Sequence, residues 1–223
     1  MKEIKPLQIR LRHPVSGLSH LGMAIVALFG FVWLVSIAVR FGSVWHIVSF
    51  ALFGATMIMV FLASALYHLI TASPKTTEVL RKIDHIAIYI FIAGCYTPIC
   101  LVPLRGGMGP LLVMSIWTLA VLGAFKKCIW IDLPRAMTVG AYVLMGALAL
   151  VALPEMLRVL TAHQLNLVFI EVFLYVTGAM VYLFKWPDPF PKVFGFHEIW
   201  HLFVIGGSAS HFVLVLDLIH FSN

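Results

Sequence analysis

The chain of 223 residues is 62% hydrophobic and only 11% charged, with a mean hydropathy of +1.03. A soluble domain carries about 25% charged residues, so this composition excludes a soluble globular protein. The formal net charge of +6 indicates orientation in a membrane and attraction to anionic lipids, and we expect membrane lipids rather than nucleic acid as partners.

Long apolar segments follow one another along the chain, each near the roughly 20 residues that a helix needs to cross a bilayer. Such unbroken runs do not fit the alternating strands of a membrane β-barrel. We therefore predict an all-α, polytopic membrane protein with a tail over residues 1–17 and a transmembrane domain over residues 18–219. The seven predicted spans are about 18–39, 44–71, 83–103, 109–125, 135–153, 163–184 and 197–219.

The basic residues fall unevenly on the two sides of this predicted bundle. Of the 15 Lys and Arg, only Arg40, Arg105 and Arg158 lie on the side opposite the N-terminus. By the positive-inside rule the N-terminus is cytoplasmic and the C-terminus lies outside. The charged tail and the full-length first span argue against a cleavable signal peptide.

Five polar residues stand out because ionisable groups inside a bilayer are costly and usually functional. Ser64 and His68 end the second span, Asp84 opens the third, and His197 and His201 open the last. The predicted orientation places all three helix ends within about two turns, or roughly 10 Å, of the cytoplasmic interface. We therefore expect these five side chains to meet at one depth.

Three imidazoles with one open position are the usual ligands of a catalytic zinc ion. We predict that His68, His197 and His201 bind zinc, although Cu, Ni or Fe would also accept such ligands. Asp84 would orient the attacking water or take its proton, and Ser64 would hydrogen-bond a substrate carbonyl or a ligand. The alternative is that these polar side chains only tie helices together through hydrogen bonds.

Three further histidines lie in or near the spans. The roles of His20, which opens the first span, and of His85, which follows Asp84, are left open. His211 lies some 20 Å from His197 along the last span, too far to share its metal. We predict a helix-packing hydrogen bond for His211.

The segment HEIWH, residues 197–201, matches the zinc-protease signature H-E-x-x-H, in which the glutamate is the catalytic base. The only acidic residue downstream is Asp217, about 24 Å from His201 along the same helix and out of reach as a third ligand. We interpret Glu198 as a headgroup-level residue whose charge suits the helix N-terminus. An intramembrane metalloprotease remains an alternative.

The segments SALYHL, KIDHIAIYIFIAGCYTP and HEIWHLFVIGGSASHF resemble the signature segments of the hemolysin III family, the bacterial branch of the progestin and adipoQ receptor (PAQR) superfamily. The resemblance implies a seven-helix bundle in the bacterial inner membrane, with zinc on His68, His197 and His201 and with Asp84 and Ser64 beside it. Animal relatives are associated with hydrolysis of lipid amides such as ceramide, and the bacterial branch with haemolysis and membrane homeostasis.

The first functional hypothesis is a metal-dependent hydrolase of a membrane lipid amide or ester. The second is a non-catalytic sensor or regulator of membrane state in which zinc fixes helix packing. A haemolytic pore former is a third, which the uniformly apolar spans disfavour. The sequence leaves the substrate open, and it equally allows a monomer or a homo-oligomer.

Overall fold

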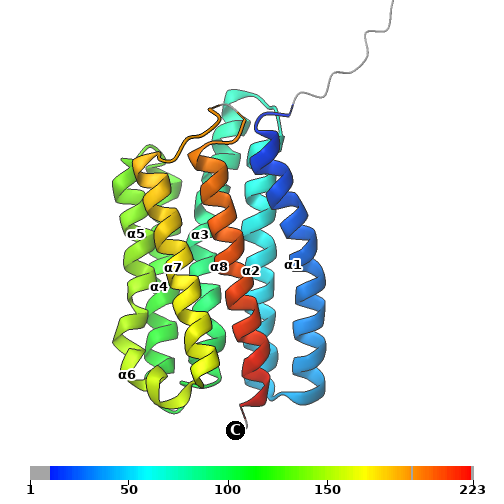
Figure 1. The fold of residues 1–223 in the computed structure, drawn as a ribbon, viewed down its shortest axis with the longest axis vertical. Coiled ribbons are helices and arrows are strands. Elements are labelled where there is room, and N and C mark those ends of the chain that lie inside the picture. Colours follow the sequence, from blue (N-terminus) through cyan, green and yellow to red (C-terminus); the bar gives the residue numbers. More distant parts are fainter. Residues whose placement is uncertain (1–10, 192, 222–223) are drawn as a thin grey trace, which may run out of the picture.

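The computed structural model describes residues 11–191 and 193–221. Figure 1 shows an all-helical bundle, as predicted. Its helices are α1 (Pro14–Phe41), α2 (Val44–Leu69), α3 (Pro74–Leu101), α4 (Gly109–Ile129), α5 (Arg135–Ala147), α6 (Ala149–Val159), α7 (Ala162–Phe184), α8 (Phe196–Asp217) and the 3-10 turn η1 (Leu218–His220). With α5 and α6 counted as one span, seven helical segments in the described chain are long and apolar enough to cross a membrane.

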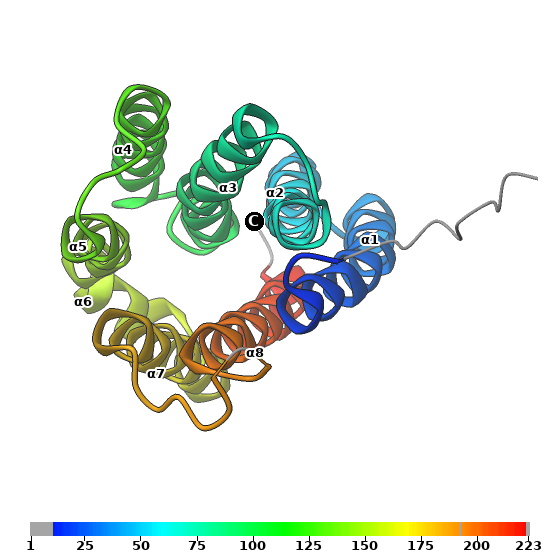
Figure 2. The same cartoon turned by 90° about the horizontal axis from the view of Figure 1, so that it is seen from above.

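The helices stand side by side and close into a ring. Seen from above, α1, α2, α3 and α4 follow one another, α5 with α6 and then α7 continue the ring, and α8 returns to α1 (Figure 2). Neighbours along the chain pack together, and the α1–α8 and α5–α7 contacts close the ring. This closure brings the start of α8 next to α1 and α2, which is what positions the candidate site.

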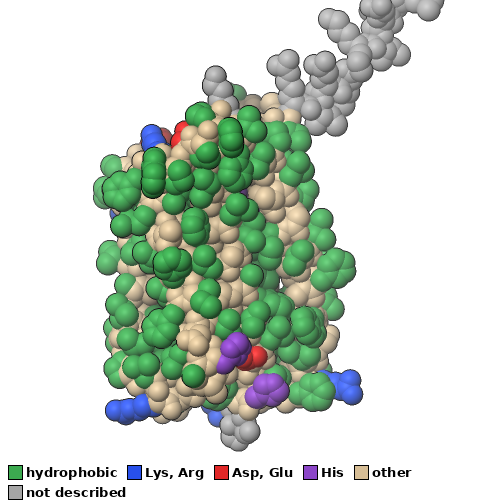
Figure 3. Space-filling model, viewed as in Figure 1, with side chains coloured by type: hydrophobic (Ala, Val, Ile, Leu, Met, Phe, Trp, Pro, Cys, Tyr) green, Lys and Arg blue, Asp and Glu red, His purple; other side chains and the backbone are tan. Residues whose placement is uncertain are grey.

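The outer face of the bundle is apolar. Large hydrophobic side chains such as Phe29, Met114, Leu144 and Phe173 are exposed, and Figure 3 shows hydrophobic side chains covering the visible face with Lys and Arg near its ends. An exposed apolar belt of this kind fits contact with lipid tails rather than with water. The chain is a multi-pass membrane protein.

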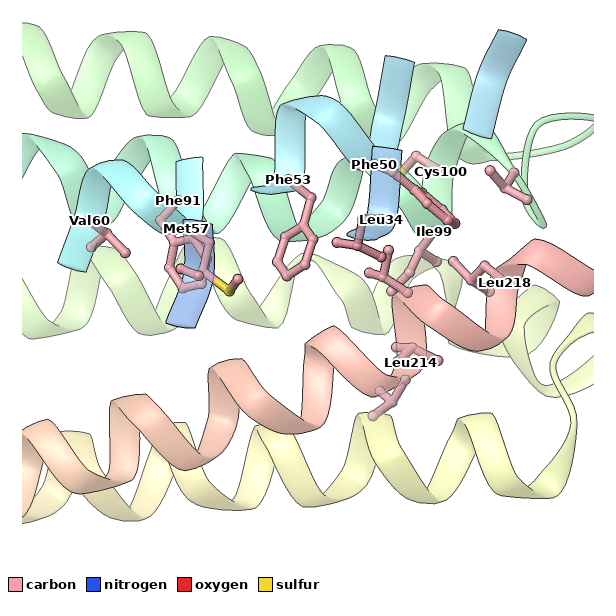
Figure 4. Close-up of a cluster of buried hydrophobic side chains, with 14 of the residues drawn as sticks. Leu34, Phe50, Phe53, Met57, Val60, Phe91, Ile99, Cys100, Leu214 and Leu218 are labelled. Carbon is pink, nitrogen blue, oxygen red and sulfur yellow. The ribbon is translucent and has the colours of Figure 1, made fainter. Parts of the chain in front are cut away.

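The interior is filled mainly by aliphatic and aromatic side chains. Leu34, Phe50, Phe53 and Leu218 are fully buried, and Figure 4 shows Leu34, Phe50 and Leu218 lying together although they come from α1, α2 and η1. Close packing of this kind stabilises membrane bundles, in which lipid offers no hydrophobic driving force between helices. The core extends to the candidate site, where the ring of Phe61 contacts that of His20.

Several predicted boundaries differ from the structure. The third helix begins at Pro74 rather than near residue 83, because Ser73 accepts a hydrogen bond from the Thr76 amide and Pro74 occupies the first turn. The first helix begins at Pro14, before the predicted start of the first span at residue 18. Residues 1–10 of that tail lie outside the described residues.

The fifth span is interrupted at Leu148, between α5 and α6. The hydroxyl of Tyr96 from α3 lies within hydrogen-bond distance of the carbonyls of Met145 and Gly146, and it accepts a hydrogen bond from the Ala149 amide. A side chain that inserts into the backbone ladder breaks a helix and satisfies the freed groups at once. The hydropathy pattern alone gave no sign of this break.

Candidate metal centre

His68, His197 and His201 meet inside the bundle, at the end where α2 finishes and α8 begins. Each offers one ligand atom, and these atoms lie within 4.8 Å of one another. The Nε2 atoms of His68 and His197 are 3.3 Å apart. His68 and His201 are buried, and His197 is partly buried.

This arrangement fits a tetrahedral zinc ion. Two nitrogens at about 2.0–2.1 Å from such an ion lie about 3.3 Å from each other, as the two Nε2 atoms do. Among the described residues, Nδ1 of His201 is buried without a hydrogen-bond partner, whereas buried polar atoms normally have one. Three neutral imidazoles are a donor set that suits Zn²⁺ and other imidazole-favouring ions.

Asp84 and Ser64, the predicted catalytic groups, lie around this cluster. Asp84 is a buried residue of α3. One Asp84 oxygen is 3.5 Å from Nδ1 of His85, which gives the neighbouring histidine a contact with the acid. Ser64 is buried one helical turn before His68 on α2.

The start of α8 is fixed by Glu198. One carboxylate oxygen accepts the Gly195 amide at 2.9 Å, and the other accepts the hydroxyl of Ser16 from α1 at 2.6 Å. The first contact closes the helix N-terminus and the second ties it to α1. Both oxygens of Glu198 are therefore engaged in structural hydrogen bonds, which supports the interpretation of Glu198 as a helix-start residue over the protease alternative.

His20 of α1 is part of the same cluster. Its ring stacks on that of His201 at a centroid distance of 3.8 Å and an interplanar angle of 15°. His20 is buried, and neither ring nitrogen has a hydrogen-bond partner among the described residues. A stacked ring of this kind restricts the orientation of the histidine that it covers.

His13 lies just before α1, with its ring 5.6 Å from that of His68. Burial and the neighbouring Arg12 guanidinium lower the pKa of His13. The backbone amide of His13 also donates to the carbonyl of His68 at 2.8 Å. The entry to α1 is therefore attached to the end of α2 beside the histidine cluster.

A second polar pair lies further along α8. Nδ1 of His211 is 2.6 Å from a carboxylate oxygen of Glu171 on α7, which agrees with the packing hydrogen bond predicted for His211. Glu171 is a polar residue of this pair that the spacing of the histidines does not predict. The sequence does contain a signal for it, because Glu171 is the only acidic residue within the predicted span 163–184. Acidic residues inside membrane spans usually have a role in function or in helix packing.

The fold and the site define a class: a seven-helix membrane protein with a buried cluster of histidines from α2 and α8 at one end of the bundle. A sequence model of the family described as "Haemolysin-III related" matches residues 10–212, so the chain belongs to this family. It is 39% identical to the "Hemolysin-3 homolog" of Bacillus subtilis (strain 168) over 185 residues, 83% of this chain and 84% of the relative. It is 37% identical to "Hemolysin-3" of Bacillus cereus over 193 residues, 86% of this chain and 85% of the relative.

Proposed function

We propose that the protein is a zinc-dependent hydrolase of a membrane lipid amide or ester in the bacterial inner membrane, with a role in membrane homeostasis. The observation that carries this proposal is the meeting of His68, His197 and His201 inside the bundle. A site inside a bundle with a lipid-facing exterior favours a substrate that arrives from the bilayer. The buried Nδ1 of His201, which has no hydrogen-bond partner among the described residues, favours a metal over a purely structural hydrogen-bond cluster.

The chain's own residues have separate tasks in this proposal. A zinc ion, when bound, supplies Lewis acidity that polarises a carbonyl and lowers the pKa of water. The Asp84 carboxylate takes the proton of the attacking water and returns it to the leaving amine or alcohol. The Ser64 hydroxyl donates a hydrogen bond to the substrate carbonyl, and His20 holds the ring of His201.

The test is the variant Asp84→Asn, which keeps the shape of the side chain but cannot accept the proton. Loss of a general base lowers turnover by about 10²- to 10⁴-fold. We expect lipid analysis of cells to show one amide or ester species that accumulates with Asp84→Asn and falls with wild type. Glu78→Gln changes an exposed acid on the same helix and should behave as wild type.

A non-catalytic role in sensing membrane state is the second candidate. It is favoured by the way the histidine cluster joins α1, α2 and α8 through close ring contacts. In that case Asp84→Asn would leave the lipid profile unchanged, while His201→Ala would lower the melting temperature strongly. An altered lipid profile with an unchanged melting temperature in Asp84→Asn excludes this second candidate.

A further inference from the structure

A polar cleft of about 280 Å³ opens at the end of the bundle that carries the histidine cluster, between α3, α4, α5 and α7. Its lining includes three basic side chains, those of Arg81, Lys127 and Arg135. The only acidic side chain in the lining is that of Asp132. By the positive-inside rule this end of the bundle faces the cytoplasm.

Lys127 is the unusual member of this lining. Its side chain is almost fully buried, with 1% of the residue exposed. Its ammonium donates to the hydroxyl of Thr138 at 2.9 Å and to the carbonyl of Ile131 at 3.5 Å, and both of these partners are neutral. Within the described residues no carboxylate pairs with it, whereas buried charges are normally paired.

Arg135 also lacks an acidic partner in the described chain. Its guanidinium lies 4.7 Å from the centroid of the Tyr182 ring and donates to the Tyr182 carbonyl at 3.1 Å. These contacts hold the guanidinium at the cleft and leave further N–H donors of its planar fork for an anion. Arg81 does have an acidic partner, Asp132 at 2.6 Å, but the Asp132 side chain is 80% exposed, so water screens that pair.

We propose that this cleft binds the phosphate group of an anionic phospholipid from the cytoplasmic leaflet. A phosphate supplies the negative charge that Lys127 and Arg135 lack, and basic pockets between transmembrane helices on this side of a membrane bind such headgroups. Ile129 and Trp130, next to the cleft lining, are exposed apolar side chains that would contact the acyl chains. The cleft adjoins the candidate metal centre. The ring of Tyr182, which lines the cleft, is 5.7 Å from that of His197, and Nδ1 of His85, another lining residue, is 3.5 Å from an oxygen of Asp84.

The experiment measures binding of phosphatidylglycerol to the purified, delipidated full chain in a neutral detergent, by native mass spectrometry and by the shift in melting temperature. Wild type should bind one phosphatidylglycerol more tightly than phosphatidylcholine. Lys127→Gln should weaken this binding roughly tenfold, the effect of losing one charge-assisted hydrogen bond. Lys126→Gln is the matched control, because it removes the same charge from an exposed position on the same helix, and its affinity should stay within about twofold of wild type.

A second variant keeps the test decisive if Lys127→Gln folds poorly. Lys127→Met preserves the shape of the side chain and buries no charge, so without lipid its melting temperature should be at least that of wild type. Lys127→Met should lose the rise in melting temperature that phosphatidylglycerol causes in wild type.

Three results would overturn the proposal or its lipid assignment. The first is an equal loss of phosphatidylglycerol affinity in Lys126→Gln and Lys127→Gln, and the second is equal binding of phosphatidylglycerol and phosphatidylcholine by wild type. A wild-type shift of the same size with inorganic phosphate alone would assign the cleft to a soluble anion and overturn the lipid assignment.

Discussion

His20 shows that the histidine cluster extends beyond the three residues with ligand spacing. Its ring lies flat against His201, 3.8 Å between centroids, and edge-on to Phe61 of α2. The ring is therefore held between α2 and α8 although it belongs to α1. Groups that orient a metal ligand affect metal affinity strongly even when they do not touch the ion.

We expect His20→Ala to weaken zinc binding about tenfold without abolishing it, because His201 loses the ring that fixes its orientation. His20→Phe keeps a stacked ring and should stay within about threefold of wild type. Competition with a chromogenic zinc chelator measures both affinities. Equal affinities for wild type and His20→Ala would show that the stack does not position His201.

The residues of the candidate site were predictable where helical spacing and span direction decide position. His68 lies at the end of α2 and His197 and His201 at the start of α8, and the direction of these helices is enough to bring the three histidines together; Asp84 lies about three turns inside α3, because that helix begins at Pro74 rather than near residue 83. The contacts of His20 with His201 and of Ser16 with Glu198 were not predictable. They depend on which faces of α1 and α8 meet, and the nearly uniform apolar character of these helices does not encode that.

At the scale of helices, α7 and α8 approach each other closely at Gly178. A Cβ atom at this position would lie 2.6 Å from Cβ of Phe203 and 2.8 Å from Cε3 of Trp200. Small residues at such places let membrane helices pack closely. This contact holds the half of α8 that carries His197 and His201.

Gly178→Ala should therefore destabilise the bundle by about 1–3 kcal/mol, the usual cost of overpacking, and lower its melting temperature in detergent. Gly140→Ala on α5 is the control, since a Cβ there meets nothing within 4 Å, and its higher helix propensity should leave stability unchanged or slightly raised. A melting temperature for Gly178→Ala equal to that of Gly140→Ala would contradict the close packing of α7 on α8.

Hydropathy predicted the number and order of the spans, because the bilayer demands about 20 apolar residues for each. It did not predict the start of α3 at Pro74, since the residues from Lys75 to Lys82 are mostly polar and form helix beyond the apolar run. Nor did it predict the break at Leu148, which depends on the Tyr96 hydroxyl from another helix. Helix capping and side-chain insertion act through single hydrogen bonds, which a hydropathy value averaged over many residues does not detect.

At the scale of the whole molecule, the orientation prediction can be tested with native cysteines. Cys128 is exposed, whereas Cys100 is buried and Cys95 is partly buried. If the N-terminal end of the bundle is cytoplasmic, a membrane-impermeant maleimide should label Cys128 in inverted vesicles and not in intact spheroplasts. Arg158→Cys combined with Cys128→Ser places the reactive cysteine at the opposite end of the bundle and should show the reverse pattern. Labelling of Cys128 from outside would show that the topology is the opposite of the predicted one.

The proposed function depends above all on a metal ion bound where α2 and α8 meet. Elemental analysis of protein purified without chelators tests this most directly. We predict about one zinc per chain in wild type and in the control His163→Ala, whose side chain is 66% exposed, and loss of that zinc in His201→Ala. Wild type without zinc, or His201→Ala with as much zinc as wild type, would contradict the account.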